Sequence, residues 1–167
     1  MRVVRWSIAV LVAASAASCA RATVERPPAG SAAAQHAEAT GRVVEVGADP
    51  VTWLALEPVA GGAQTRLGGP ATAAMRAVLG AIVWVSGSRS ANGFTVDVFE
   101  VRRIGDRDVD DGVVIVSEQG VQLRMHSGTL RDIPNATPAL RAAAGARVWV
   151  SRPVEGVAPS YGVIAHP

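Results

Sequence analysis

Apolar and polar residues alternate in short runs through most of this chain, which is the pattern of β-strands with one buried face. The clearest run is 121–126, where apolar Val, Leu and Met alternate with polar Gln, Arg and His. Glycine, proline and asparagine separate the runs and mark turns. We therefore expect an all-β chain from Gly41 onward, with strands near 43–46, 52–57, 65–67, 81–86, 94–101, 113–116, 121–126, 129–133, 147–151 and 161–165.

One segment occurs twice, 65 positions apart and without a gap. Ala71–Ser86 and Ala136–Ser151 are identical at eleven of sixteen positions. Each copy begins with a short helical pattern, reaches a glycine (Gly80 or Gly145) where a helix ends with positive φ, and continues as a strand. Self-similarity of this length indicates a duplicated structural unit. Residues shared by the copies are constrained by packing first.

The order of the expected elements is the same in both halves: three strands, a short helix, then two strands. This order resembles the five-stranded OB barrel, which places its helix between its third and fourth strands, and more loosely an SH3-like barrel. The resemblance is one of fold, over 41–167, without a family signature. It implies two tandem small OB-like barrels, 41–105 and 106–167. Units of about sixty residues are marginal alone, so we expect them to pack on each other.

The first forty residues have a different character. A short basic start and an apolar run give 1–18 the layout of a secretory signal peptide, too short for a membrane span. Ala16–Cys19 resembles the lipobox of bacterial lipoproteins, although Ala16 replaces the commoner Leu. The resemblance implies a lipid on Cys19 and, because Ala20 follows, the outer membrane. Alternatively, Cys19 is an ordinary residue near a cleavage site. We expect 19–40, rich in Ala and Pro, to be a flexible tether, with His36 solvated.

Charge argues against nucleic acid as a partner. All 16 basic residues are arginines, and two leave with the predicted signal peptide, so 14 face the 14 acidic residues of the mature chain. A nucleic-acid footprint needs a concentrated basic surface. Cys19 is the only cysteine, which excludes a disulfide within one chain.

Two tryptophans give the sharpest site hypothesis. The valines of strands 82–86 and 147–151 share one face and predict the interior, so Trp84 and Trp149 point outward. They either pack between the two units or under the short helix, or they bind a ligand. In the second reading Trp149 and Arg147 form a platform for a sugar ring, lipid head group or partner side chain. Trp84 is the weaker third member of this predicted site.

Ile82 stands in the first copy where Arg147 stands in the second. This difference predicts that only the second unit binds.

Two further patterns contain residue types that bind metals or catalyse hydrolysis. The acidic stretch 106–112 has oxygen ligands at alternate positions, as in a calcium loop, but Asp111 stands where that loop needs Gly and Ser117 where it needs Glu. A solvated linker between the units is the better interpretation. His126 lies on the polar face of a predicted strand, and the sequence around it has neither a nucleophile turn nor a motif that would orient the histidine. A hydrolase centred on His126 is therefore kept only as a third hypothesis, for contrast with binding and structural roles. We expect no catalytic residue, no metal and no cofactor.

Together these patterns predict a non-catalytic lipoprotein of the cell envelope that faces the periplasm. Its leading function is to bind an envelope protein, a saccharide or a lipid head group. The alternative is a purely structural or assembly element. A fold by itself does not identify the ligand that a protein binds.

Overall fold

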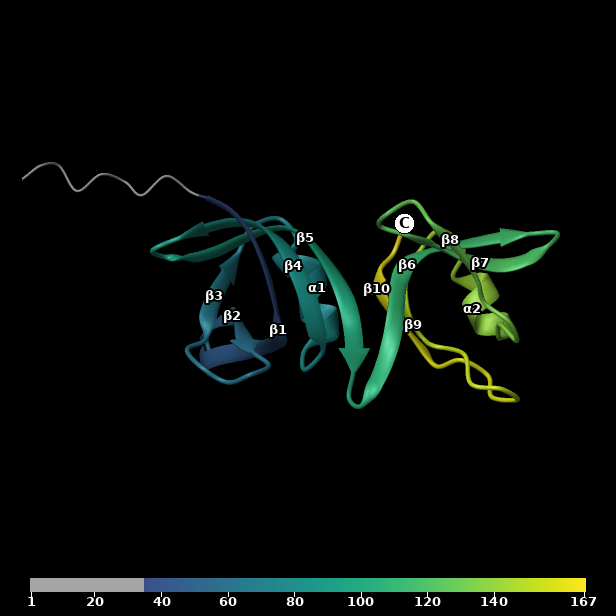
Figure 1. The fold of residues 1–167 in the computed structure, drawn as a ribbon, viewed down its shortest axis with the longest axis horizontal. Helices are drawn as coiled ribbons and strands as arrows, with labels where there is room; N and C mark the ends of the chain where they lie inside the picture. The colour runs from purple at the N-terminus through teal and green to yellow at the C-terminus, as the bar shows by residue number, and fades with distance from the viewer. Residues whose placement is uncertain (1–34) are drawn as a thin grey trace, which may run out of the picture. The chain divides into compact units, whose positions relative to one another are not determined.

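A computed structural model describes residues 35–167, which belong to one compact unit of the chain. The predicted signal peptide, Cys19 and most of the predicted tether lie outside the described residues. The prediction of an all-β protein is confirmed, since strands dominate and the helices are single turns (Figure 1).

The elements fall into two sets with the same order. The first repeat contains β1 (Gln35–Ala48), β2 (Val51–Pro58), β3 (Thr65–Gly68), α1 (Thr72–Met75), the 3-10 turn η1 (Arg76–Val78), β4 (Ile82–Ser90) and β5 (Gly93–Ile104). The second repeat contains β6 (Arg107–Ser117), β7 (Gly120–Met125), β8 (Leu130–Asp132), α2 (Pro138–Ala142), β9 (Arg147–Ser151) and β10 (Tyr161–Ala165). One hydrogen-bonded sheet includes all ten strands.

The strands of the first repeat form a ring. β1 pairs antiparallel with both β2 and β4, β2 pairs with β3, and β4 pairs with β5. The parallel pairing of β3 with β5, at Leu67 with Phe94, closes the circuit. A ring leaves no free sheet edge.

The second repeat makes the same four antiparallel pairings but does not close. β6 pairs with β7 and β9, β7 with β8, and β9 with β10. Within residues 35–167 no pairing joins β8 to β10. The structure therefore contains one ring of five strands and one open set, in place of two tandem barrels. The physical reason is length: β8 and β10 have three and five residues, whereas β3 and β5 have four and twelve.

The twin segments adopt equivalent conformations. Gly80 and Gly145 follow their helical turns at φ +82° and +81°, as predicted. The amide of Gly80 donates to the Val43 carbonyl at 2.8 Å, and that of Gly145 donates to the Val114 carbonyl at 2.9 Å. The two valine amides donate back to the residue after each glycine, Ala81 and Ala146, at 2.9 and 3.0 Å. Each copy therefore fixes its helix to its first strand with the same two bonds.

A further pair of equivalent glycines lies in β1 and β6. A Cβ atom on Gly41 would lie 2.5 Å from the Glu57 carbonyl oxygen, and one on Gly112 would lie 2.5 Å from that of Arg124. Each glycine is paired on both sides, with β2 and β4 or with β7 and β9. Such close approach of backbones is a typical reason for glycine inside a strand.

Two predicted boundaries need correction. β1 begins at Gln35, so the end of the predicted tether is a strand, and His36 pairs opposite Ser88. The acidic stretch 106–112 is not a solvated linker, because β6 begins at Arg107 and places Asp110 and Asp111 at 7% and 3% exposure. Arginines far along the chain neutralise both carboxylates, which the local pattern did not reveal.

Buried apolar residues form two clusters, one in each repeat. The first cluster also contains Val109 and Ile164 from the second repeat, and the partly buried Trp149 packs against it. Because β10 lies against α1 and η1, Ile164 lies on the helical side of the first core. The expectation that the two repeats pack on each other is thus met by shared apolar packing.

Candidate functional site

The predicted binding residue Trp149 lies in the contact between the two repeats. Its outward direction from β9 is as expected, but its half-buried indole packs on the first core. It also covers Gly162 of β10, where a Cβ atom would lie 2.5 Å from the indole nitrogen. Trp149 is therefore engaged in packing, which was one of the two readings of its pattern.

Arg147 holds the polar half of this contact. Its guanidinium makes a two-point ion pair with Asp111, at 2.9 Å from Nε and 2.7 Å from Nη2. Nη2 also donates to the Phe99 carbonyl at 2.5 Å, and the guanidinium lies 4.2 Å from the Phe99 ring centroid. Asp111 completes the set by accepting the Val101 amide at 2.8 Å. We call Asp111, Arg147, Phe99 and Val101 the joint.

The joint satisfies every charge that it buries. Asp111 would be costly to bury alone, and a two-point arginine pair with a backbone donor offsets much of that cost. Both partners are in the second repeat, and they reach the backbone of β5 in the first. The guanidinium of Arg147, which was predicted to contact a ligand, therefore binds Asp111 and the Phe99 carbonyl within the molecule.

Trp84 does not join Trp149. It lies half-buried on β4, where its indole nitrogen donates to Glu38 of β1 at 3.3 Å. The three predicted site residues are therefore not gathered at one surface.

The structure places an arginine–indole stack where the sequence did not suggest one. The guanidinium of Arg66 on β3 lies 5.5 Å from the Trp53 ring centroid on β2. The two residues are thirteen positions apart, and only the pairing of β2 with β3 brings them together. Their contact was not visible as a spacing in the sequence.

His126 lines a small cavity of about 190 Å³ beside the joint, together with Arg147, Asp111 and Phe99. The carboxylate there is already engaged by Arg147 and Val101, and no residue lining the cavity carries a hydroxyl. Among residues 35–167, no group of three or more His, Cys, Asp or Glu is placed to hold a metal. The residues of this cavity therefore do not form the set of histidine, free carboxylate and hydroxyl that the hydrolase hypothesis requires.

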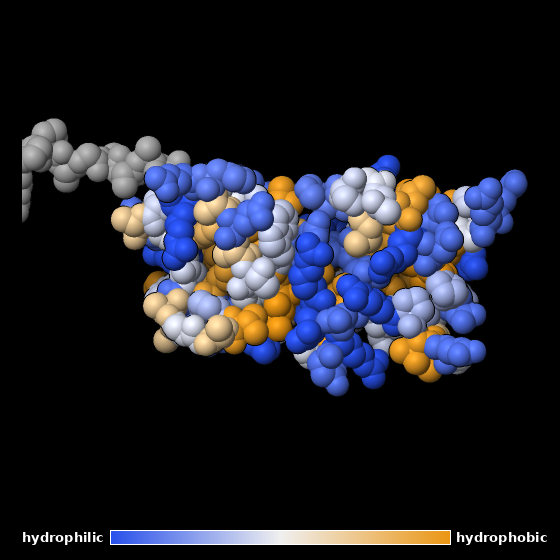
Figure 2. Space-filling model, viewed as in Figure 1, coloured by the Kyte–Doolittle hydropathy of each residue, from blue (hydrophilic) through white to orange (hydrophobic). Residues whose placement is uncertain are grey.

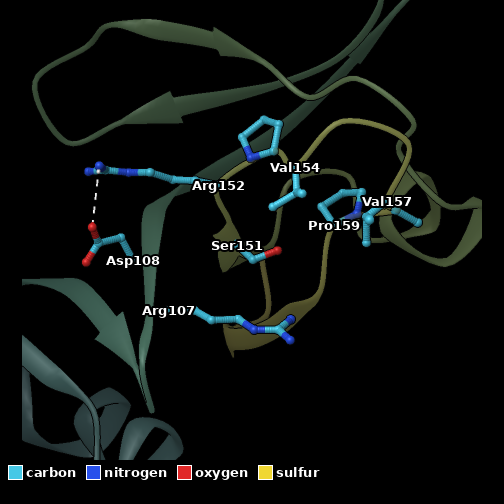
Figure 3. A pocket seen from close by; sticks show the side chains of 9 residues that line it. Arg107, Asp108, Ser151, Arg152, Val154, Val157 and Pro159 are labelled. Carbon is cyan, nitrogen blue, oxygen red and sulfur yellow. Dashed lines mark ion pairs between the residues drawn. The ribbon is translucent and has the colours of Figure 1, made fainter.

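A groove of about 440 Å³ lies beside the start of β6 (Figure 3). The local sequence does not predict this groove, because its lining comes from two segments that are far apart along the chain. The loop between β9 and β10 forms one wall, and the start of β6 supplies Arg107 and Asp108. The lining is mostly apolar, from Pro153, Val154, Val157, Ala158 and Pro159. A mainly apolar pocket of 300–1,000 Å³ with a few polar groups is the usual form of a ligand site.

The loop is ordered by its own hydrogen bonds. The Val157 amide donates to the Val154 carbonyl at 3.1 Å across a turn in which Gly156 has positive φ. At the base of the loop, Ser151 and Ser160 exchange two bonds at 2.8 and 2.9 Å. The groove wall therefore has a defined shape, with Val154 and Val157 at 64% and 54% exposure.

The two arginines of the groove differ in their partners. Arg152 pairs with Asp108 and Asp110, at 3.8 and 3.5 Å, and Figure 3 shows it directed away from the valines. Asp110 also pairs with Arg131 of β8. Within the described residues, Arg107 makes neither an ion pair nor a side-chain hydrogen bond. Figure 2 shows hydrophilic residues gathered across the middle of one face, where β6 lies in Figure 1.

No protein-family model, curated protein or solved structure matches this chain. Among the described residues, no helix has the length and apolar character needed to span a membrane.

Proposed function

We propose that this protein is a non-catalytic binding module of the cell envelope that holds a ligand in the groove beside β6. The groove is the observation that carries the proposal. Its size fits a ligand, its wall is apolar yet exposed, and its loop is held in shape by internal bonds. Preformed apolar pockets with few polar groups bind ligands with little reorganisation.

The fold supports a binding role by analogy. We infer that the ring of the first repeat is an OB-like barrel, because its strand order, its helix between β3 and β4 and its parallel β3–β5 pairing agree with that architecture. Barrels of this kind commonly bind ligands. The second repeat is then an opened copy, and its longer β9–β10 loop builds the groove.

Location follows from the sequence features of the first nineteen residues. In this proposal the signal peptide directs export, Cys19 carries a lipid, and the module faces the periplasm from the outer membrane. Labelled palmitate should enter the wild-type chain in cells and should not enter a Cys19→Ser variant. Equal labelling of the two chains would contradict the lipid anchor on Cys19. It would not bear on the proposal that the groove binds a ligand.

Site-specific photocrosslinking tests the groove itself. A photoreactive amino acid at Val157 should give an adduct with a molecule of the envelope in cells that produce the protein. The same amino acid at Val51, which is 68% exposed on β2 outside the groove, is the matched control. Identical adducts from both positions, or none from Val157, would contradict binding at the groove.

The structural alternative also has an observation in its favour. Trp149 and Arg147 are engaged between the repeats, as a spacer or assembly element would require. The two functions differ in what the groove does. With the photoreactive amino acid kept at Val157, a spacer tolerates Val154→Ser without a change in its adducts, whereas a binding module loses much of its adduct because Val154 lines the groove.

A further inference from the structure

We propose that the groove takes an anionic amphiphile of the fatty-acid type, with the alkyl chain on the loop valines and the carboxylate on Arg107. This inference rests on the proposed function, since it names the ligand class of the same groove. It follows from three features of the lining: paired exposed valines, one uncommitted cation, and backbone donors that are already engaged.

The valines supply the surface for an alkyl chain. Val154 and Val157 lie opposite each other in a two-residue bridge, so their side chains share one face. Ala158 and the two prolines extend that surface into the groove. The corresponding turn of the first repeat, between β4 and β5, is only Ala91–Asn92. The apolar wall is therefore a feature of the second repeat.

Arg107 supplies the charge. The carboxylates near the groove are held by other arginines: Asp108 by Arg103 at 3.1 Å and by Arg152, and Asp110 by Arg131 and Arg152. Arg107 is left with no anion among residues 35–167. A guanidinium beside an apolar wall suits an anionic head group, and it binds a carboxylate with two parallel hydrogen bonds.

The backbone of the lining argues against a peptide as the ligand. Pro153 and Pro159 have no N–H group, and the amides of Ser151, Arg152 and Val157 already donate to partners within the molecule. A peptide placed here would find few of the backbone donors that its carbonyl groups need, which is unfavourable once water is excluded. An alkyl chain has no such groups.

Titration of the full chain with three eight-carbon probes tests the inference. The probes are octanoate, octan-1-ol and octyltrimethylammonium, each below its micelle-forming concentration, and binding is followed by amide chemical shifts of the loop. Octanoate should bind most tightly. Its Kd should exceed that of decanoate and fall below that of hexanoate, with a two- to fourfold change expected, in rough terms, for each methylene buried.

Two variants assign the charge. Arg107→Gln should weaken octanoate about three- to tenfold and leave octan-1-ol unchanged, because it removes a charge-assisted bond and keeps the fold. Arg89→Gln makes the same charge change on β4, outside the groove, and should alter neither ligand.

The outcomes separate this inference from the proposed function. If octan-1-ol binds as well as octanoate and Arg107→Gln has no effect, the anionic class is wrong and the groove is still a ligand site. If the ammonium probe binds best, the charge assignment is wrong. If no alkyl probe shifts the loop amides while the Val157 photocrosslink persists, the ligand is of another class and the inference is overturned.

Discussion

The two repeats share a construction plan and differ in what their outer surfaces do. In both repeats, the same pair of backbone hydrogen bonds connects the end of the helical turn to the first strand. Both repeats also have a glycine at the position where that first strand pairs with a strand on each side. The first repeat closes into a ring. The second stays open and directs Trp149 and Ile164 into the core of the first. The two repeats thus agree in their internal backbone contacts and differ in their outward-facing residues.

The joint depends on two substitutions between the copies. Ile82 of the first repeat corresponds to Arg147 in the twin segments. The strands that precede them align on Gly41 and Gly112, so Thr40 corresponds to Asp111. Where the first copy has an apolar and a hydroxyl residue, the second has an ion pair that reaches β5. The difference teaches that the second copy contacts the first through residues that have no counterpart in the first copy.

The largest expected effect comes from the equivalent helix residues Met75 and Leu140, both 0% exposed. Met75→Ala and Leu140→Ala should each lower the free energy of unfolding by about 2–5 kcal/mol. Because the repeats share packing, each variant should unfold in a single transition, measured by urea denaturation with far-ultraviolet circular dichroism. Two separate transitions in Leu140→Ala, with only one displaced, would show independent repeats and break the comparison.

Removing the buried carboxylate of the joint should have the next largest effect. Asp111→Ala should cost about 2–4 kcal/mol, at the lower end of what breaking a buried pair costs because Arg147 keeps 28% exposure. Asp97→Ala, on the exposed side of β5, is the control and should change stability little. Equal effects of the two variants in urea denaturation would contradict the role of the joint.

The tryptophans give a smaller and contrasting pair. Trp149→Ala should cost about 2–3 kcal/mol, because it empties a contact between the repeats, and Trp84→Ala about 1 kcal/mol, because it loses one exposed hydrogen bond and a half-buried ring. Thermal unfolding of both variants checks the order. A larger loss for Trp84→Ala would mean that the outward face of β4, and not that of β9, carries the packing.

The smallest effect concerns a contact that only the first repeat has. Hydrogen bonds from Thr52 and Arg76 hold the pKa of Glu45 below its ordinary value of 4.5. In the second repeat, Val116 corresponds to Glu45 and Arg141 to Arg76. Glu45→Gln should therefore reduce stability slightly at neutral pH.

The pH dependence gives this prediction its sign. A carboxylate with a lowered folded-state pKa stabilises the protein above pH 4.5 and loses that effect as pH falls through the lowered value. Wild type and Glu45→Gln should therefore converge in acid, in urea titrations from pH 7 to pH 3. A difference that grows in acid would contradict the assigned contact.

Local patterns predicted the elements well and their long-range partners poorly. The twin segment, the glycine stops and the alternation of 121–126 are properties of neighbouring residues, and the structure agrees with them. The burial of Asp111 depends on Arg147, 36 positions away, so its acidic surroundings suggested a solvated linker. The groove depends on a loop meeting the start of another strand. The second repeat stays open because β8 and β10 are short and do not pair with each other. No local sequence pattern indicates that this pairing is missing.

The amide of Val101 tests the central claim, that the second repeat is fastened to the first through the joint. This N–H donates to the Asp111 carboxylate, whereas the amides of Val43 and Val114 report the interior of each repeat. In native-state hydrogen exchange, Val101 should be protected to within about tenfold of the other two, and Asp111→Ala should speed the exchange of Val101 more than that of Val43 or Val114. Fast exchange at Val101 in the wild type, with Val43 and Val114 still protected, would contradict the account.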